Sequence, residues 1–169
     1  NYFFAEMGYR MGMDKLNQYF SAFGLGSPTG IETGESAGQL PSQNAGENLA
    51  PWAAFGQANQ LYTPIQLANY TATLCGGGDR YATHLLKSVR SSSSGALEYV
   101  YDAAPVESIS MDEDNLAAVL GGMRDLAAEG AVSAYFKDCI VDAAAKTGTV
   151  QTGDEENNNG AFICFAPYD

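Results

Sequence analysis

Four consecutive residues near the end of the chain combine a cation, two hydroxyl groups and a glycine: Lys146, Thr147, Gly148 and Thr149. We call them the KTGT segment. Threonine suits a pleated, half-buried surface, whereas glycine inside a strand often marks a place where a ligand or another backbone comes close. The ammonium and hydroxyl groups around such a gap would offer a positive charge and hydrogen-bond donors to an anionic ligand. The alternative is a plain edge strand whose lysine blocks aggregation.

The residues around the KTGT segment predict the strand that positions it and a second strand beside it. Small residues at 143–145 would let the first strand pack closely against its neighbours. Residues 154–160 are acidic and rich in turn formers, which predicts a hairpin loop. Residues 161–166 are continuously apolar and predict a second strand that is buried on both faces. Such a strand needs another element to cover it, so we expect further sequence beyond Asp169.

Two segments in the first half of the chain have the spacing and end signals of helices. Residues 2–23 carry apolar side chains at helical spacing, with a break near residues 8–12. Thr63 and Pro64 predict a helix start, because threonine is a good N-cap and proline suits the first helical position. Three glycines at 76–78 end that helix. The connection between the two helices is rich in Gly, Pro, Ser and Asn and includes one short predicted strand at 29–32.

The second half of the chain predicts a hairpin and a third helix. Strands are expected at 81–90 and 97–101, around a serine-rich turn. Residues 110–113 read Ser-Met-Asp-Glu and predict a capping box, and the apolar stripe behind them ends at Gly130. A short amphipathic piece at 131–136 leads into the KTGT strand. The predicted fold class is therefore α+β, with a mostly antiparallel sheet and helices such as 111–129 packed against it.

The overall composition limits the kinds of partner and cofactor. The chain has 169 residues, a net charge of -12 and only eight Lys and Arg, which argues against nucleic acid or an anionic membrane as partner. No signal peptide and no apolar run of transmembrane length is present. Cys75, Cys139 and Cys164 lack metal-ligand spacing, so we expect buried free thiols, no metal and no cofactor. The single histidine, His84, is expected to be structural or exposed.

Four stretches of the sequence together resemble penicillin-binding protein transpeptidase domains. The KTGT segment and residues 160–167 resemble the third and fourth sheet strands of that family. Three further stretches agree in order and spacing: residues 1–4 look like the family's sequence from the last position of its Ser-x-Asn motif, residues 23–32 resemble its Phe-Gly-Leu-Gly and Thr-Gly-Ile-Glu stretches, and residues 56–68 resemble its Gly-Gln and Thr-Pro-x-Gln-Leu-Ala run. The likeness covers nearly the whole chain and is greatest to the class B, monofunctional members.

The resemblance implies a serine acyl-transfer enzyme that cross-links peptidoglycan stem peptides ending in D-Ala-D-Ala and is acylated by β-lactams. Lys146 would support proton transfer and hold the substrate carboxylate, and the hydroxyls of Thr147 and Thr149 would bind the same carboxylate. The backbone N–H of Thr149 would be one of two oxyanion donors. Gly148 would let the acylated serine approach the strand, and Asn1 would be the last residue of the Ser-x-Asn motif.

The chain departs from the family pattern at the nucleophile. No Ser-x-x-Lys motif occurs, because the residues three before the four lysines are Gly12, His84, Ala134 and Ala143. Ser42-Gln43-Asn44 matches Ser-x-Asn but lies too late in the sequence, so we interpret it as a polar loop. We therefore expect residues 1–169 to be a partial transpeptidase domain, truncated at both ends and inactive alone. The upstream part of the same domain is an expected partner if it is a separate chain.

Three other functions compete with the transpeptidase. A β-lactamase or β-lactam sensor of the same fold would share the KTGT segment and differ in deacylation rate. A non-catalytic module binding wall peptides or a partner protein would lack Ser-x-x-Lys in the full-length gene as well. The third is a carboxylate-based hydrolase, since the chain has 20 Asp and Glu. However, residues 112–114 suit a helix N-terminus, and residues 154–156 suit a solvated loop. The resemblance implies an extracytoplasmic, membrane-anchored parent, with the fragment itself soluble.

Overall fold

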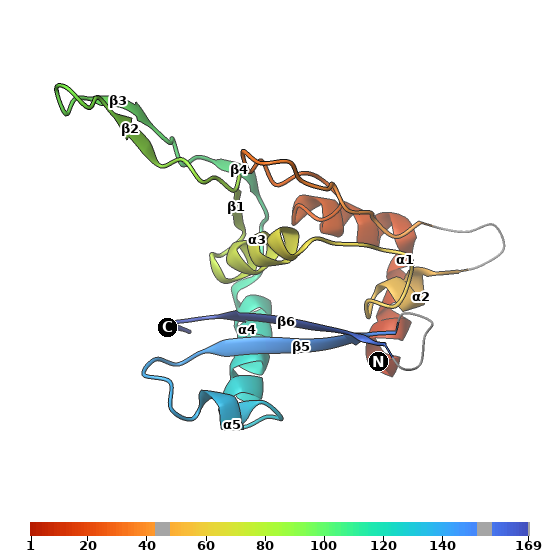
Figure 1. Ribbon diagram of the computed structural model, residues 1–169. Helices are drawn as coiled ribbons and strands as arrows, with labels where there is room; N and C mark the ends of the chain where they lie inside the picture. The colour runs from red at the N-terminus through yellow and green to blue at the C-terminus, as the bar shows by residue number, and fades with distance from the viewer. Residues whose placement is uncertain (43–47, 152–156, 169) are drawn as a thin grey trace.

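The computed structural model describes residues 1–42, 48–151 and 157–168 (Figure 1). Most of the Ser42-Gln43-Asn44 triplet and the acidic part of the predicted 154–160 loop lie outside these ranges. The elements follow in the order α1 (Tyr2–Ala22), α2 (Ala50–Ala53), α3 (Pro64–Cys75), β1 (Asp79–Tyr81), β2 (Ser88–Arg90), β3 (Leu97–Val100), β4 (Pro105–Ser108), α4 (Glu113–Ala128), α5 (Ser133–Phe136), β5 (Ala144–Val150) and β6 (Asn159–Phe165). Helices and antiparallel strand pairs confirm the α+β class.

Helix α1 is kinked where the sequence predicted a break. Gly12 has a φ of 77°, outside the helical region, and a Cβ at this position would meet no neighbour. Gly8 lies against α2 instead, and a Cβ there would collide with the carbonyl oxygen of Ala50. The two helices share a small core in which Leu16, Ala50 and Ala53 are buried. Close approach at Gly8 therefore brings α2, and the loop after it, onto α1.

Helix α3 begins at the predicted position and is tied to the loops around it. Thr63 and Gln66 form a capping box, in which each side chain bonds to the backbone of the other residue. Gln66 is 1% exposed, and its Nε2 also donates to the carbonyls of Ser27 and Ala37, each at 2.8 Å. One buried amide thus satisfies backbone groups from three segments.

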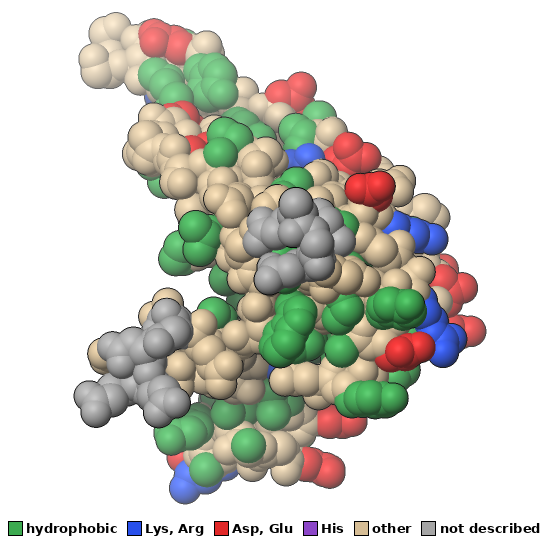
Figure 2. All heavy atoms as spheres, turned by 90° about the vertical axis from the view of Figure 1, so that its right-hand side faces the viewer, with side chains coloured by type: hydrophobic (Ala, Val, Ile, Leu, Met, Phe, Trp, Pro, Cys, Tyr) green, Lys and Arg blue, Asp and Glu red, His purple; other side chains and the backbone are tan. Residues whose placement is uncertain are grey.

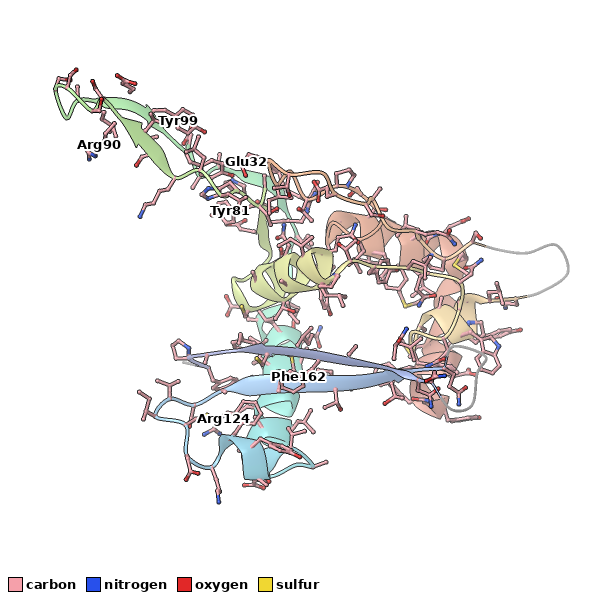
Figure 3. All side chains as sticks on the ribbon, viewed as in Figure 1. Glu32, Tyr81, Arg90, Tyr99, Arg124 and Phe162 are labelled. Atoms are coloured by element: carbon pink, nitrogen blue, oxygen red, sulfur yellow. The ribbon has the colours of Figure 1, made fainter. Side chains whose placement is uncertain are left out.

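Strands β5 and β6 form the sheet that carries the KTGT segment. They pair in one unbroken antiparallel register from Ala144 opposite Phe165 to Val150 opposite Asn159. A core cluster of Leu74, Met123 and Ala144 joins this sheet to α3 and α4. Arg124 of α4 pairs with Asp142 at 2.8 Å, just before β5, and lies 5.3 Å from the ring centroid of Tyr168 (Figure 3). Helix α4 therefore anchors both ends of the hairpin.

Strand β6 is less covered than its apolar sequence predicted. Phe162 is 51% exposed, so the prediction of burial on both faces is wrong for this structure. Within the described part of the chain β6 pairs with one strand, β5, and a groove of about 590 Å³ is lined by β6 and α3. The three cysteines are free, as expected, but they are exposed, which corrects the prediction of buried thiols.

Two short ladders build an arm that projects from the body (Figure 1). Strand β1 pairs with β4 at the base, and β2 pairs with β3 beyond it. The predicted hairpin around the serine turn is confirmed, although the predicted 81–90 strand is divided between β1 and β2. Glu32 lies beside the base of the arm, and Arg90 and Tyr99 lie along it (Figure 3).

Two local predictions fail because side chains capture the backbone groups concerned. No strand forms at 29–32, since the Glu35 carboxylate accepts the N–H groups of Thr29 and Gly30, each at 2.9 Å. At α4 the N-cap is Asp112 and not Ser110, because the Asp112 carboxylate accepts the Asn115 N–H at 3.0 Å. The predicted capping box is therefore wrong, although the helix itself is confirmed.

Candidate active site

The KTGT segment leaves the core along β5 and becomes exposed. Ala144 and Ala145 are completely buried, and every residue of β5 from Lys146 onward is exposed. The small residues fix the start of the strand within the core, as the sequence predicted. The Lys146 ammonium donates to the carbonyl of Thr147. The structure thus presents the cation, the two hydroxyls and the glycine together on one accessible strand.

Among the residues that the structure describes, Gln57 is the one side chain from outside the β5–β6 hairpin that bonds to the open edge of β5. Its Nε2 donates to the Thr149 carbonyl at 2.9 Å, and its Oε1 accepts the Gln151 N–H at 3.3 Å. These two backbone groups therefore point away from β6. Because a strand residue directs its N–H and its C=O to the same side, the Thr149 N–H also faces this open edge.

Gln57 is positioned by the end of α2. Gly56 has a φ of 83°, a left-handed conformation that favours glycine, and lets the chain turn after the helix. The backbone N–H of Gln57 then donates to the Trp52 carbonyl at 2.9 Å. The sequence indicated Gly56 and Gln57 only as part of the family likeness. Their contact with β5 was missed, because the bonded residues are 92 and 94 positions apart.

The backbone hydrogen bond of Asn1 is made within α1 and not with the KTGT segment. It is the N-cap residue of α1, its carbonyl accepts the Ala5 N–H at 2.9 Å, and its side chain makes no capping bond. Within the described ranges, no hydrogen bond or ion pair joins Asn1 to the KTGT segment. In the view of Figure 1 the chain start lies near the end of β5. The predicted catalytic role of Asn1 therefore stays a prediction.

Other polar groups serve structural contacts. His84 stacks on Tyr101, with ring centroids 3.5 Å apart. The Ser42 hydroxyl accepts from the Asn59 amide at 2.8 Å, which supports the interpretation of a polar loop. Backbone N–H groups of Leu85 and Leu86 lower the pKa of Glu32, as expected for a carboxylate that accepts hydrogen bonds. In the part of the chain that the structure describes, no three His, Cys, Asp or Glu side chains are grouped as metal ligands.

The sequence profile of the penicillin binding protein transpeptidase domain matches residues 1–169, the whole chain. The chain belongs to this family. Its structure is similar to that of penicillin-binding protein 2B from Streptococcus pneumoniae strain R6, with a TM-score of 0.79 and 26% identity over 92% of this chain and 27% of that one. The sequence resemblance is thereby confirmed at the level of family and fold.

Curated relatives agree with this assignment. Penicillin-binding protein 2A of Bacillus subtilis is 31% identical over 92% of this chain and 24% of its own length. Peptidoglycan D,D-transpeptidase MrdA of Haemophilus influenzae is 29% identical over 99% of this chain and 29% of its own length. The chain thus spans about a quarter of the length of these relatives. None of the helices in the described ranges is long and apolar enough to cross a bilayer.

Proposed function

We propose that this transpeptidase-family chain supplies the substrate-binding wall of a peptidoglycan D,D-transpeptidase. The observation that carries the proposal is the exposed KTGT segment on a strand whose outer edge is open for most of its length. A peptide substrate or a β-lactam would lie along this edge, in the manner of an added strand. Relatives named peptidoglycan D,D-transpeptidase support the reaction class.

Each residue of the KTGT segment has a distinct role in this proposal. The Lys146 ammonium attracts the terminal carboxylate of the D-Ala-D-Ala stem peptide and assists proton transfer. The hydroxyls of Thr147 and Thr149 donate to the same carboxylate. Gly148, which has no side chain, leaves room for the acylated serine beside the strand.

The Thr149 N–H is proposed as one of two donors to the oxyanion. It faces the open edge, where the carbonyl under attack would lie. Losing one such donor typically lowers the catalytic rate by about 100- to 1000-fold. Because this N–H belongs to the backbone, side-chain substitution at Thr149 would test only the hydroxyl.

The attacking serine and its base are proposed to lie on sequence outside this chain, because no Ser-x-x-Lys motif occurs in it. The upstream part of the domain, β-lactams and stem peptides are the proposed partners, and the parent protein is proposed to be extracytoplasmic and membrane-anchored. Asn1 would complete the site from the start of α1. Residues 1–169 remain a proposed partial domain.

A fluorescent penicillin tests the proposal directly. The chain alone should give no covalent band after denaturing electrophoresis, because nucleophile and base act as a unit. A covalent band on the isolated chain would contradict the missing nucleophile.

The full-length protein should be acylated, and Lys146→Ala should lower its second-order acylation rate constant by about 100-fold. Lys137→Ala, at another exposed lysine, is the matched control and should leave the rate unchanged. Equal rates for Lys146→Ala and wild type would overturn the role of the KTGT segment. Rapid release of the fluorophore would favour a β-lactamase over a transpeptidase.

A further inference from the structure

The Gln57 amide supplies hydrogen bonds to the open edge of β5 that a neighbouring strand would otherwise supply. An antiparallel partner offers each outward-facing residue one donor and one acceptor. Gln57 offers both from one side chain, with Nε2 on the Thr149 carbonyl at 2.9 Å and Oε1 on the Gln151 N–H at 3.3 Å. Within the described residues, the only other side chain bonded to this edge is Lys146, on the Thr147 carbonyl.

We propose that Gln57 is a positioning residue that sets the direction of the Thr149 N–H for oxyanion binding. The inference rests on the proposed function. In this proposal Gln57 bonds to the strand backbone and takes no part in proton or acyl transfer. It acts by holding the peptide groups that follow Thr149, so that the backbone of this residue cannot rotate away from the open edge.

Gln57 is supported by the end of α2, as a positioning role requires. Its own N–H is held by the Trp52 carbonyl at the end of α2. Helix α2 in turn packs on α1 through Ala50 and Ala53, which are 1% and 2% exposed. Gln57 therefore links the kinked helix α1, where the chain begins, to the strand that carries the KTGT segment.

The exposed position of β5 makes such a link necessary. Residues from Lys146 to Val150 are all exposed, so packing against side chains does little to fix this part of the strand. A misplacement of about 1 Å in a reacting group can cost about 100-fold in rate. An oxyanion donor near the end of a strand with one open edge is sensitive to such a displacement.

Amide hydrogen exchange on the 169-residue chain tests the hydrogen bonds of Gln57, and this measurement does not depend on enzymatic activity. Gln57→Ala should speed exchange of the Gln151 N–H by about tenfold or more, because this bond to the side chain is lost. Gln39→Ala is the matched control, since the Gln39 amide also bonds a loop carbonyl, that of Asn59 at 2.7 Å. Unchanged Gln151 exchange in Gln57→Ala would overturn the proposal.

Acylation kinetics of the full-length protein with a penicillin test the positioning role. Gln57→Ala should lower the acylation rate by about 10- to 100-fold and leave the dissociation constant of the non-covalent complex unchanged. Gln57→Glu keeps an acceptor for Gln151 but turns a carboxylate toward the Thr149 carbonyl, so it should be slowed as well. Equal rates in wild type and both variants would overturn the proposal.

The two experiments separate this proposal from the proposed function. A wild-type full-length protein that is never acylated would refute the transpeptidase activity and, with it, the positioning role of Gln57. The exchange result would then report only a structural hydrogen bond. If the wild type is acylated and the Gln57 variants are acylated at the same rate, the proposed function stands and the positioning role of Gln57 fails.

Discussion

At the scale of single residues, two carboxylates near the base of the arm accept hydrogen bonds from backbone N–H groups. Glu35 accepts from the N–H groups of Thr29 and Gly30 and, at 2.8 Å, from the Thr29 hydroxyl. The Glu32 carboxylate accepts from the backbone N–H groups of Leu85 and Leu86, which are 53 and 54 positions later in the sequence. These bonds favour the ionised form, and the Thr29 N–H is the main cause of the lowered pKa of Glu35.

We predict that this arrangement makes the fold sensitive to acid. A lowered pKa in the folded state stabilises the protein above the unfolded value of 4.5, and this contribution is lost as the pH falls through the folded pKa. Glu35→Gln should lower the melting temperature at neutral pH and reduce its further fall on acidification. Thermal unfolding at a series of pH values measures this. Glu98→Gln, an exposed carboxylate on β3, is the control and should behave as wild type.

At the scale of elements, the contact between α1 and α2 depends on a glycine with no room beside it. Gly8 is buried, and a Cβ there would lie 2.6 Å from the Ala54 Cβ and collide with the Ala50 carbonyl. Helix propensity alone would favour alanine over glycine at this position. Steric exclusion outweighs propensity, because the obstacle includes backbone that cannot rotate away.

We predict that Gly8→Ala destabilises the chain by about 1–3 kcal/mol through overpacking. Gly122→Ala is the matched control, because Gly122 lies inside α4 and a Cβ added there would have no neighbour within 4 Å. It should stabilise by about 0.5–1 kcal/mol. Urea unfolding of both variants measures the difference, and a Gly8→Ala variant as stable as Gly122→Ala would contradict the prediction.

Elements whose signals are local could be predicted from the sequence, and long-range contacts could not. Thr63 and Pro64 mark the start of α3, and Gly12 marks the kink, because cap and backbone preferences act over a few residues. Asp112 displaced Ser110 as a cap because two good capping residues stood close together. In the site, the KTGT strand followed from its own residues. The bonds of Gln57 did not, because no local pattern specifies a partner 92 residues away.

At the scale of the whole molecule, the hydrophobic core is divided. One cluster joins α1 and α2 around Leu16, and a second joins α3, α4 and the β5–β6 sheet around Met123. Figure 2 shows hydrophobic side chains exposed on the face nearest α1 and α2, with acidic groups mainly toward its right-hand and lower edges. Tyr2, Phe3 and Trp52 are among the exposed apolar residues of these two helices.

We predict that the two clusters lose protection separately. Leu16→Ala should cost about 2–5 kcal/mol, because it opens a cavity in the first cluster. Amides of α1 and α2 should then exchange faster, while those in the β5–β6 ladder keep most of their protection. Met123→Ala should instead speed exchange in the β5–β6 ladder and leave most of the protection of α1 and α2. Hydrogen exchange with mass spectrometry measures both, and uniform loss of protection in either variant would show that the core is one cooperative unit.

The arm has a further consequence for handling the protein. The β1–β4 ladder at its base joins the two chain segments that lead into and out of the β2–β3 hairpin. A protease cut in its serine-rich tip at 91–94 would leave both pieces held by this ladder. The same tip would accept an epitope or a fluorophore without altering β5. It offers an attachment point for testing the proposed acylation of the full-length protein by fluorescence.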